Sequence, residues 1–261
     1  MTAMKRHGRL AAVLTAALLA ACGDKIDRTV TGPAPAARIK FFNFGVNAPG
    51  VDFYANSVKM TAINSAIGVE STRGTIYGEG GAGGFYVNIS PGQYTLNGKI
   101  TDTTSHGLAI SAASQTVENG KAYSFYQSGF YNATTKTVDA FVLEDAWTPP
   151  TDLTKASIRF VNTISNATGP LTLVVKSQST GSSEIVIGLP VDYKGATTYT
   201  TIPFGVYDLY ARYTGSSTNV FTRTGVSFGI GRVYTVAARG DITVPGTTAT
   251  NRPFFDSTPN Y

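Results

Sequence analysis

The sequence is poor in the side chains on which most catalytic and metal sites depend. It contains one cysteine, Cys22, and two histidines, His7 and His106. A single cysteine has no intramolecular disulfide partner, and so few histidines leave zinc short of nitrogen ligands. Charged residues make up only 14% of the chain, and no cluster of Lys or Arg follows the first nine residues. This distribution argues against nucleic acid as a partner.

Long hydrophobic runs are also missing. The apolar run Leu10–Leu19 has about half of the ~20 residues that a membrane-spanning helix needs. Three basic residues precede it, and Ala20 and Ala21 follow it. A positive start, a short apolar core and small residues before a cut site indicate a secretory signal peptide over residues 1–21. Its removal lowers the formal net charge from +5 to +2.

The end of this segment, Leu19-Ala20-Ala21-Cys22, resembles the bacterial lipobox. The resemblance implies cleavage between Ala21 and Cys22 and lipid, including palmitate, on the Cys22 thiol. A lone cysteine in a secreted chain fits this assignment. Gly23 after the cysteine resembles the sorting signal for the outer membrane. We therefore expect an outer-membrane lipoprotein of the cell envelope, and the sequence leaves open whether it faces the periplasm or the surface.

After the leader the sequence predicts an all-β protein. Residues 22–36 are short of apolar bulk and end in Pro-rich sequence, which is typical of a tether. Strand-like alternation begins at Arg38–Phe44 and continues at Val51–Ala55. The composition, rich in Gly, Thr, Tyr and Phe, favours strands joined by glycine-containing turns. No stretch has a convincing helical period.

Three segments recur in the same order and at similar spacing. The pairs are Ala37–Asn43 with Ala156–Asn162, Ile89–Tyr94 with Ile202–Tyr207, and Val117–Tyr123 with Phe228–Tyr234. The repetition predicts two tandem immunoglobulin-like β-sandwich domains, because each copy holds several short strands. The expected division is signal peptide 1–21, tether 22–36, first domain 37–147, linker 148–152, second domain 153–245 and C-terminal tail 246–261.

These repeats resemble DUF4397, a domain of bacterial secreted and surface lipoproteins. The resemblance rests on the opening strand at Ala37–Phe42 and on Asn47–Tyr54, which matches the family's Asp-Ala-Pro-x-Val-Asp-Val-Tyr continuation. The second copy departs from that pattern at Asn166–Leu173, which lacks its Asp and Tyr. The resemblance implies an architecture but no chemistry, because the family's function is undefined.

Motifs for catalysis or for cofactors are weak. His106 follows Ser105 directly, but no G-x-S-x-G elbow is present, and a loop histidine is the better interpretation. The glycine-rich segment Gly78–Phe85 lacks the Lys-Ser/Thr ending of a phosphate loop and predicts a flexible hairpin connection. Glu144–Asp145 is interpreted as a solvated strand end. We predict no catalytic, cofactor-binding or metal-binding residue, although a calcium site built from loops stays open.

The tyrosines are the best indication of a binding surface, because Tyr joins a flat apolar ring to a polar tip. Five of them lie in strand-like or loop sequence and are the candidate ligand contacts: Tyr126, Tyr131, Tyr199, Tyr210 and Tyr213. The alternative is that they pack in the core, since Tyr is a favoured strand residue.

The sequence thus predicts a non-enzymatic envelope protein. It is held in the membrane by lipid on Cys22, and its β-sandwich modules bind or adhere to an unidentified envelope protein or glycan. Two alternatives remain: a structural accessory subunit of an outer-membrane assembly, and a carbohydrate-active hydrolase using carboxylates.

Overall fold

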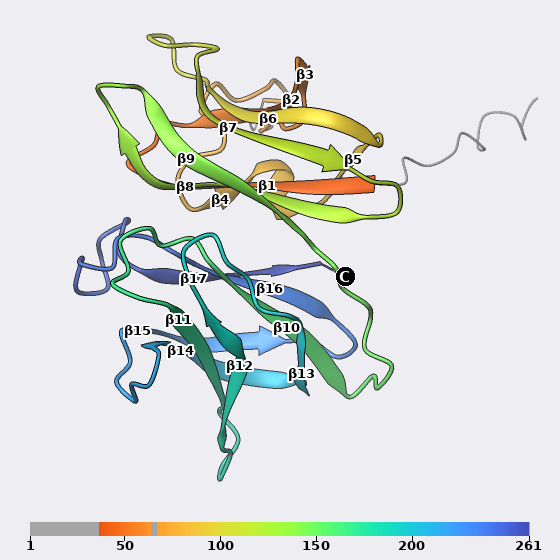
Figure 1. Cartoon of the computed structure of the whole chain (residues 1–261), viewed down its shortest axis with the longest axis vertical. Helices are drawn as coiled ribbons and strands as arrows, with labels where there is room; N and C mark the ends of the chain where they lie inside the picture. The colour runs from red at the N-terminus through yellow and green to blue at the C-terminus, as the bar shows by residue number, and fades with distance from the viewer. Residues whose placement is uncertain (1–36, 64–66, 261) are drawn as a thin grey trace, which may run out of the picture.

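The computed structural model describes residues 37–63 and 67–260 and contains two β-sandwiches of the immunoglobulin-like kind (Figure 1). Within these residues the regular structure consists of strands and one 3₁₀ turn. The all-β prediction is therefore confirmed. The predicted signal peptide, Cys22 and the whole of the predicted tether lie outside the described residues. The described part of the chain contains no helix whose length and hydropathy would let it span a bilayer.

The first sandwich consists of an inner and an outer sheet. The first inner sheet has the order β4-β1-β8-β9, with β5 also paired to β1, and the first outer sheet has the order β3-β2-β6-β7. Their strands are β1 (Ala37–Val46), β2 (Val51–Ala55), β3 (Val58–Lys59), β4 (Glu79–Gly80), β5 (Val87–Ile89), β6 (Gly92–Ile100), β7 (Ala109–Val117), β8 (Ala122–Asn132) and β9 (Thr137–Glu144). Strand β1 runs parallel to β8, and the other pairings in both sheets are antiparallel.

The second sandwich repeats this arrangement. The second inner sheet has the order β13-β10-β16-β17, and the second outer sheet has the order β12-β11-β14-β15. Their strands are β10 (Lys155–Asn162), β11 (Leu171–Ser177), β12 (Glu184–Val191), β13 (Thr200–Pro203), β14 (Gly205–Tyr213), β15 (Phe221–Phe228), β16 (Val233–Arg239) and β17 (Phe254–Pro259). Strand β10 is parallel to β16, as β1 is to β8.

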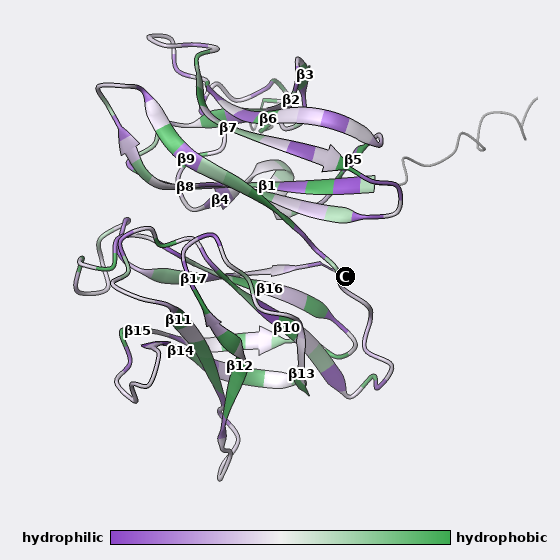
Figure 2. Cartoon of the chain, in the orientation of Figure 1, coloured by the Kyte–Doolittle hydropathy of each residue, from purple (hydrophilic) through white to green (hydrophobic). Residues whose placement is uncertain are grey.

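The four sheets stack as layers, with the two inner sheets facing each other in the middle (Figure 1). One apolar core lies inside each sandwich, and a third joins the inner sheets. Hydrophobic and hydrophilic residues alternate along many strands, as half-buried strands require (Figure 2). The middle core contains Phe42, Phe44, Tyr126 and Phe141 from the first sandwich. Burying each such ring contributes roughly 1.5–3 kcal/mol, so this contact joins the two sandwiches firmly.

The repeated sequence segments make the same local hydrogen bonds in both sandwiches. The Tyr94 hydroxyl donates to the carbonyl oxygen four residues earlier at 3.0 Å, and the Tyr207 hydroxyl does the same at 2.7 Å. The hydroxyls of Tyr123 and Tyr234 each accept from the backbone amide five residues earlier, at 3.1 and 2.9 Å. These tyrosines fix the entries to β6, β14, β8 and β16, so the repeat reflects equivalent positions in space.

Two expectations about connecting segments are wrong. The expected C-terminal tail contains β17, which pairs with β16 and completes the second inner sheet. The glycine-rich segment is a packed part of the first inner sheet: its residues Glu79–Gly80 form β4, and Gly81–Gly84 form the 3₁₀ turn. A Cβ on Gly80 would lie 2.6 Å from the Cα of Gly84. The glycines there allow close backbone approach.

Candidate binding site

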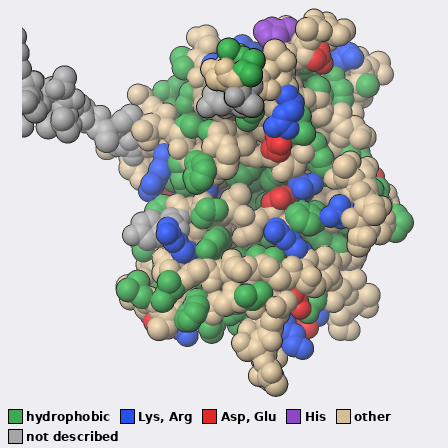
Figure 3. All heavy atoms as spheres, turned by 180° about the vertical axis from the view of Figure 1, so that it is seen from behind, with side chains coloured by type: hydrophobic (Ala, Val, Ile, Leu, Met, Phe, Trp, Pro, Cys, Tyr) green, Lys and Arg blue, Asp and Glu red, His purple; other side chains and the backbone are tan. Residues whose placement is uncertain are grey.

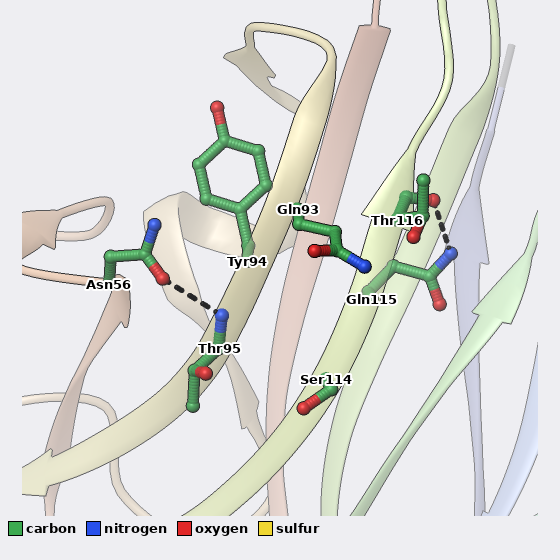
Figure 4. Close-up of a pocket in the computed structure, with 7 residues that line it drawn as sticks. All are labelled: Asn56, Gln93, Tyr94, Thr95, Ser114, Gln115 and Thr116. Atoms are coloured by element: carbon green, nitrogen blue, oxygen red, sulfur yellow. Dashed lines mark hydrogen bonds between the residues drawn. The ribbon is translucent and has the colours of Figure 1, made fainter.

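The first outer sheet carries an open pocket of about 400 Å³, here called the first outer pocket. It lies between the turn after β2 and the neighbouring ends of β6 and β7 (Figure 4). Its lining residues are Asn56, Gln93, Tyr94, Thr95, Ser114, Gln115 and Thr116. The pocket is therefore built where a β-turn meets a hairpin, and one turn and two strands position its side chains.

Local backbone geometry holds one wall of this pocket in place. Asn56 has a φ of 55°, a left-handed conformation that Asn tolerates better than most residues. Its side-chain oxygen accepts from the amide of Thr95 at 2.9 Å, and its own amide donates to the carbonyl of Thr95 at 2.9 Å. Asn56 and Thr95 are exposed, as are the Gln93, Ser114 and Thr116 side chains. The turn is thus fixed, while polar groups beside it face solvent.

The lining has a distinct chemistry, because it contains three amide side chains, three hydroxyls, one tyrosine and no charged group. Amides and hydroxyls both donate and accept hydrogen bonds, and a tyrosine ring offers a flat apolar face. Together they suit a neutral ligand that carries many hydroxyl groups. On the rear of the molecule, charged side chains lie mainly across the middle, among hydrophobic side chains and areas of uncharged polar side chains and backbone (Figure 3).

The five candidate tyrosines do not come together in one site. Tyr126 is 1% exposed and stacks on Phe42 and Phe141 between the inner sheets, so no ligand reaches it in this arrangement. Tyr131 packs against the first core. Tyr213 packs against the second core, and its hydroxyl accepts from the amide of Thr168 at 3.3 Å. Tyr126 is therefore a packing residue and not a ligand contact.

The other two tyrosines line separate pockets. Tyr199 lines a pocket of about 500 Å³ beside the contact between the sandwiches, together with Arg159. Burial raises the pKa of Tyr199, and its hydroxyl accepts from the side-chain amide of Asn260 at 2.6 Å. Tyr210 lines a pocket of the second outer sheet. His106 is exposed in the connection between β6 and β7.

The interpretation of Glu144–Asp145 as a solvated strand end is wrong for Asp145. Its carboxylate is buried and ion-paired with Arg159 of the second sandwich. Tyr86 and Ser124 donate hydroxyl hydrogen bonds to it at 2.6 and 2.7 Å. Burial of the Arg159 guanidinium lowers its pKa, but the Asp145 carboxylate and the neighbouring tyrosines together raise it by more, so the net shift is upward. This pair fixes the contact between the inner sheets.

Lys40 of the first sandwich makes the corresponding contact with the second sandwich. Its ammonium group donates to the carbonyl oxygen of Pro259 and, at 3.0 Å, to the side-chain oxygen of Asn260. It also lies 4.3 Å from the centre of the Tyr86 ring. Burial lowers its pKa to about 8, although Asp145 acts in the opposite direction.

One feature of the sequence indicates the contact between the two inner sheets, although strand periodicity alone does not show it. Strand β1 has Ile39 and Phe41 on one face and Phe42 and Phe44 on the other. A strand that is apolar on both faces is covered on both sides, which predicts a second layer over the first inner sheet. The lining of the first outer pocket gave no such signal, because its polar residues are ordinary for an exposed strand.

The fold and pocket define a tandem β-sandwich protein with a polar pocket in its outer sheet. The family DUF4397, a domain of unknown function, matches residues 37–173, and the chain belongs to this family. The match covers the first sandwich, the linker and β10, and it ends inside β11.

Comparison with other proteins adds little about function. None of the curated proteins matches the chain. A candidate cell adhesion protein from Bacteroides ovatus is 9% identical, with a TM-score of 0.28 over 87% of this chain and 97% of the other. A leucine-rich repeat protein from Bacteroides thetaiotaomicron is 12% identical, with a TM-score of 0.19 over 81% of this chain and 26% of the other. Both TM-scores are low, so neither likeness bears on function.

Proposed function

We propose that this chain is a non-catalytic, lipid-anchored envelope protein that binds a neutral glycan in the first outer pocket. The observation that carries the proposal is the lining of that pocket: amides, hydroxyls and one tyrosine, with no charged side chain. Neighbouring sugar hydroxyls match the paired donors and acceptors of amide side chains. The ring of Tyr94 packs partly against the first core, and its exposed part offers an apolar surface to a sugar face.

The rest of the chain presents this pocket away from a membrane. In the proposal, lipid on Cys22 holds the protein in the outer membrane, and residues 22–36 separate the sandwiches from it. The second sandwich is a second copy of the DUF4397 domain. The same strand order in both sandwiches and the equivalent tyrosine hydrogen bonds support this assignment.

Binding is tested with the mature chain carrying Cys22→Ser, which keeps both sandwiches and removes the site of lipidation. Migration in native gels containing dextran, mannan, xylan or laminarin measures the interaction. We expect retardation by at least one of these polysaccharides, and at least a tenfold weaker interaction for Gln93→Ala/Ser114→Ala. These two side chains are exposed, so the fold is unaffected.

The matched control is Thr103→Ala/Thr104→Ala, which removes two exposed hydroxyls at the other end of the same hairpin. The control is expected to bind like the parent protein. Equal retardation of the pocket variant and the control would assign binding to another surface. Absence of retardation in every gel would refute glycan binding of this kind.

The anchor is tested separately in cells. An alkyne-bearing fatty acid should label the full-length protein, and Cys22→Ser should abolish the label. Protease treatment of intact cells then reports the face of the membrane, since surface-exposed sandwiches are digested while a periplasmic control survives. Labelling of Cys22→Ser at the parent level would contradict lipidation at this residue.

A further inference from the structure

The second outer sheet has a pocket of its own, here called the second outer pocket, of about 420 Å³. Its lining residues are Lys176, Ser177, Gln178, Ser179, Gly181, Ser182, Asp208 and Tyr210. It lies at the end of β11, where the chain turns towards β12, and beside β14. Nothing in the sequence apart from Tyr210 pointed to it.

Strand register places part of the second pocket at a position equivalent to part of the first. In the first outer sheet Ala55 pairs with Leu96. The two strands are antiparallel, so Asn56, the residue after Ala55, lies next to Thr95, the residue before Leu96. In the second outer sheet Val175 pairs with Leu209, and the corresponding neighbours are Lys176 and Asp208, which pair directly. The repeat aligns Leu96 with Leu209, because each lies two residues after an equivalent tyrosine. The two pockets thus share this turn and this strand, but the first extends over residues 114–116 of β7, whereas the second extends over residues 177–182 before β12.

The lining of the second pocket also suits a hydroxyl-rich ligand. Three serine hydroxyls and the Gln178 amide surround the site, and Tyr210 supplies an aromatic ring. Asp208 is already ordered, since its carboxylate accepts from the Gln178 side chain at 2.8 Å and from the amide of Gly225 at 3.1 Å. The Arg212 guanidinium lies over the Tyr210 ring, 5.4 Å from its centre. Lys176 and Asp208 add charged hydrogen-bonding groups that the first pocket lacks.

The two pockets belong to the outermost layers, at opposite ends of the four-sheet stack (Figure 1). The apolar core and the ion pair between the inner sheets hold those layers in a fixed relation. One short ligand cannot enter both pockets, because both sandwiches lie between them. Two separate ligand chains can each occupy one.

We infer that the second outer pocket is a second glycan-binding site and that the protein bridges two polysaccharide strands. The inference rests on the proposed function, since it takes the ligand class from the first pocket. Two independent sites held rigidly apart convert a binding protein into a cross-linker. In the envelope this activity joins neighbouring glycan chains.

The experiment uses beads coated with whichever of dextran, mannan, xylan or laminarin the mature Cys22→Ser protein binds. The parent protein is expected to agglutinate the beads. Lys176→Ala/Ser179→Ala, which alters two exposed side chains of the second pocket, should abolish agglutination while bead binding persists. Titration with an oligosaccharide of the same polymer should give two sites in the parent and one in this variant.

The control is Ser217→Ala/Thr218→Ala, which changes two exposed residues in the connection between β14 and β15. It should agglutinate beads like the parent. Agglutination that survives in the second-pocket variant, or a parent that binds through one site and never agglutinates, would overturn the bridging inference and leave the first pocket intact. A parent that binds none of the four polysaccharides would overturn both the inference and the proposed function.

Discussion

Lys40 in β1 and Arg159 in β10 occupy the same place in the repeat, and each reaches across the interface to the end of the other sandwich's last strand. Arg159 bonds the carbonyl of Glu144 and the carboxylate of Asp145. Lys40 bonds the corresponding backbone carbonyl at the end of β17 and the side chain of Asn260. The contacts are reciprocal, as in an isologous dimer related by a two-fold axis. The two sandwiches of one chain thus pack as two subunits do.

This symmetry predicts the effect of Asn260→Asp. Asn260 corresponds to Asp145, and it lies beside two hydroxyls, those of Tyr199 and Thr235, that can turn to donate to a carboxylate. A carboxylate at position 260 favours the charged form of Lys40 and so raises the pKa of this lysine. Each unit by which the pKa rises stabilises the folded protein by about 1.4 kcal/mol. We expect the free energy of unfolding at pH 7 to rise by on the order of 1 kcal/mol, measured by urea denaturation.

The reciprocal change, Asp145→Asn, serves as its control and should act in the opposite direction. It leaves the Arg159 guanidinium buried without a counter-charge, which costs about 3 kcal/mol or more. If both changes shifted stability equally and in the same direction, the two ends of the interface would not be equivalent.

Lys40 makes the stability depend on pH in the alkaline range. Below about pH 8 this lysine is charged in both the folded and the unfolded protein, and the cost of burying the charge is fully present. Between about pH 8 and the ordinary lysine value of 10.5 the folded protein releases the proton before the unfolded chain does. The parent should therefore gain stability relative to Lys40→Met over this range, by on the order of 3 kcal/mol.

Urea denaturation of both proteins at pH 7 and pH 10 measures this difference. Lys136→Met, at an exposed turn position, is the comparison and should show no such gain. A constant difference between the parent and Lys40→Met across the range would mean that Lys40 is solvated in the folded protein.

Tyr126 is expected to act as a packing residue between the sandwiches. Tyr126→Ala removes a ring that stacks on both Phe42 and Phe141, and large-to-small changes of this kind cost about 3–5 kcal/mol. Phe130→Ala, on the same strand but 42% exposed, should cost less than about 1 kcal/mol. Thermal denaturation compares them, and equal losses would contradict burial of Tyr126.

Position 80 requires glycine because the backbone of Gly84 lies too close to it for a side chain. Gly80→Ala places a Cβ 2.6 Å from the Cα of Gly84, so the 3₁₀ turn must move away from β4. We expect a loss of about 1–3 kcal/mol, as for other overpacked sites. Gly169→Ala, where an added Cβ meets nothing within 4 Å, should be neutral or slightly stabilising. Denaturant midpoints distinguish the two, and a neutral Gly80→Ala would show that the segment is as loose as the sequence predicted.

Local sequence determined the strands, their turns and the repeat. Alternation at Arg38–Phe44 predicted β1, and the paired segments around Tyr94 and Tyr207 predicted equivalent strand entries, because periodicity and turn chemistry act between near neighbours. The charge and apolar pattern of residues 1–21 predicted a leader, and the resemblance to the lipobox implied a lipidated Cys22; the described residues include neither. These features depend on residues only a few positions apart.

The tertiary structure alone decided what covers each face. Alternation states which residues share a face of a strand, but it does not state whether solvent or another sheet meets that face. Asp145 therefore looked solvated until β10 brought Arg159 against it, and residues 254–259 looked like a tail until β16 provided an edge to pair with. The two outer pockets likewise exist only because folding joins a turn to a strand about 30 or more residues away in sequence.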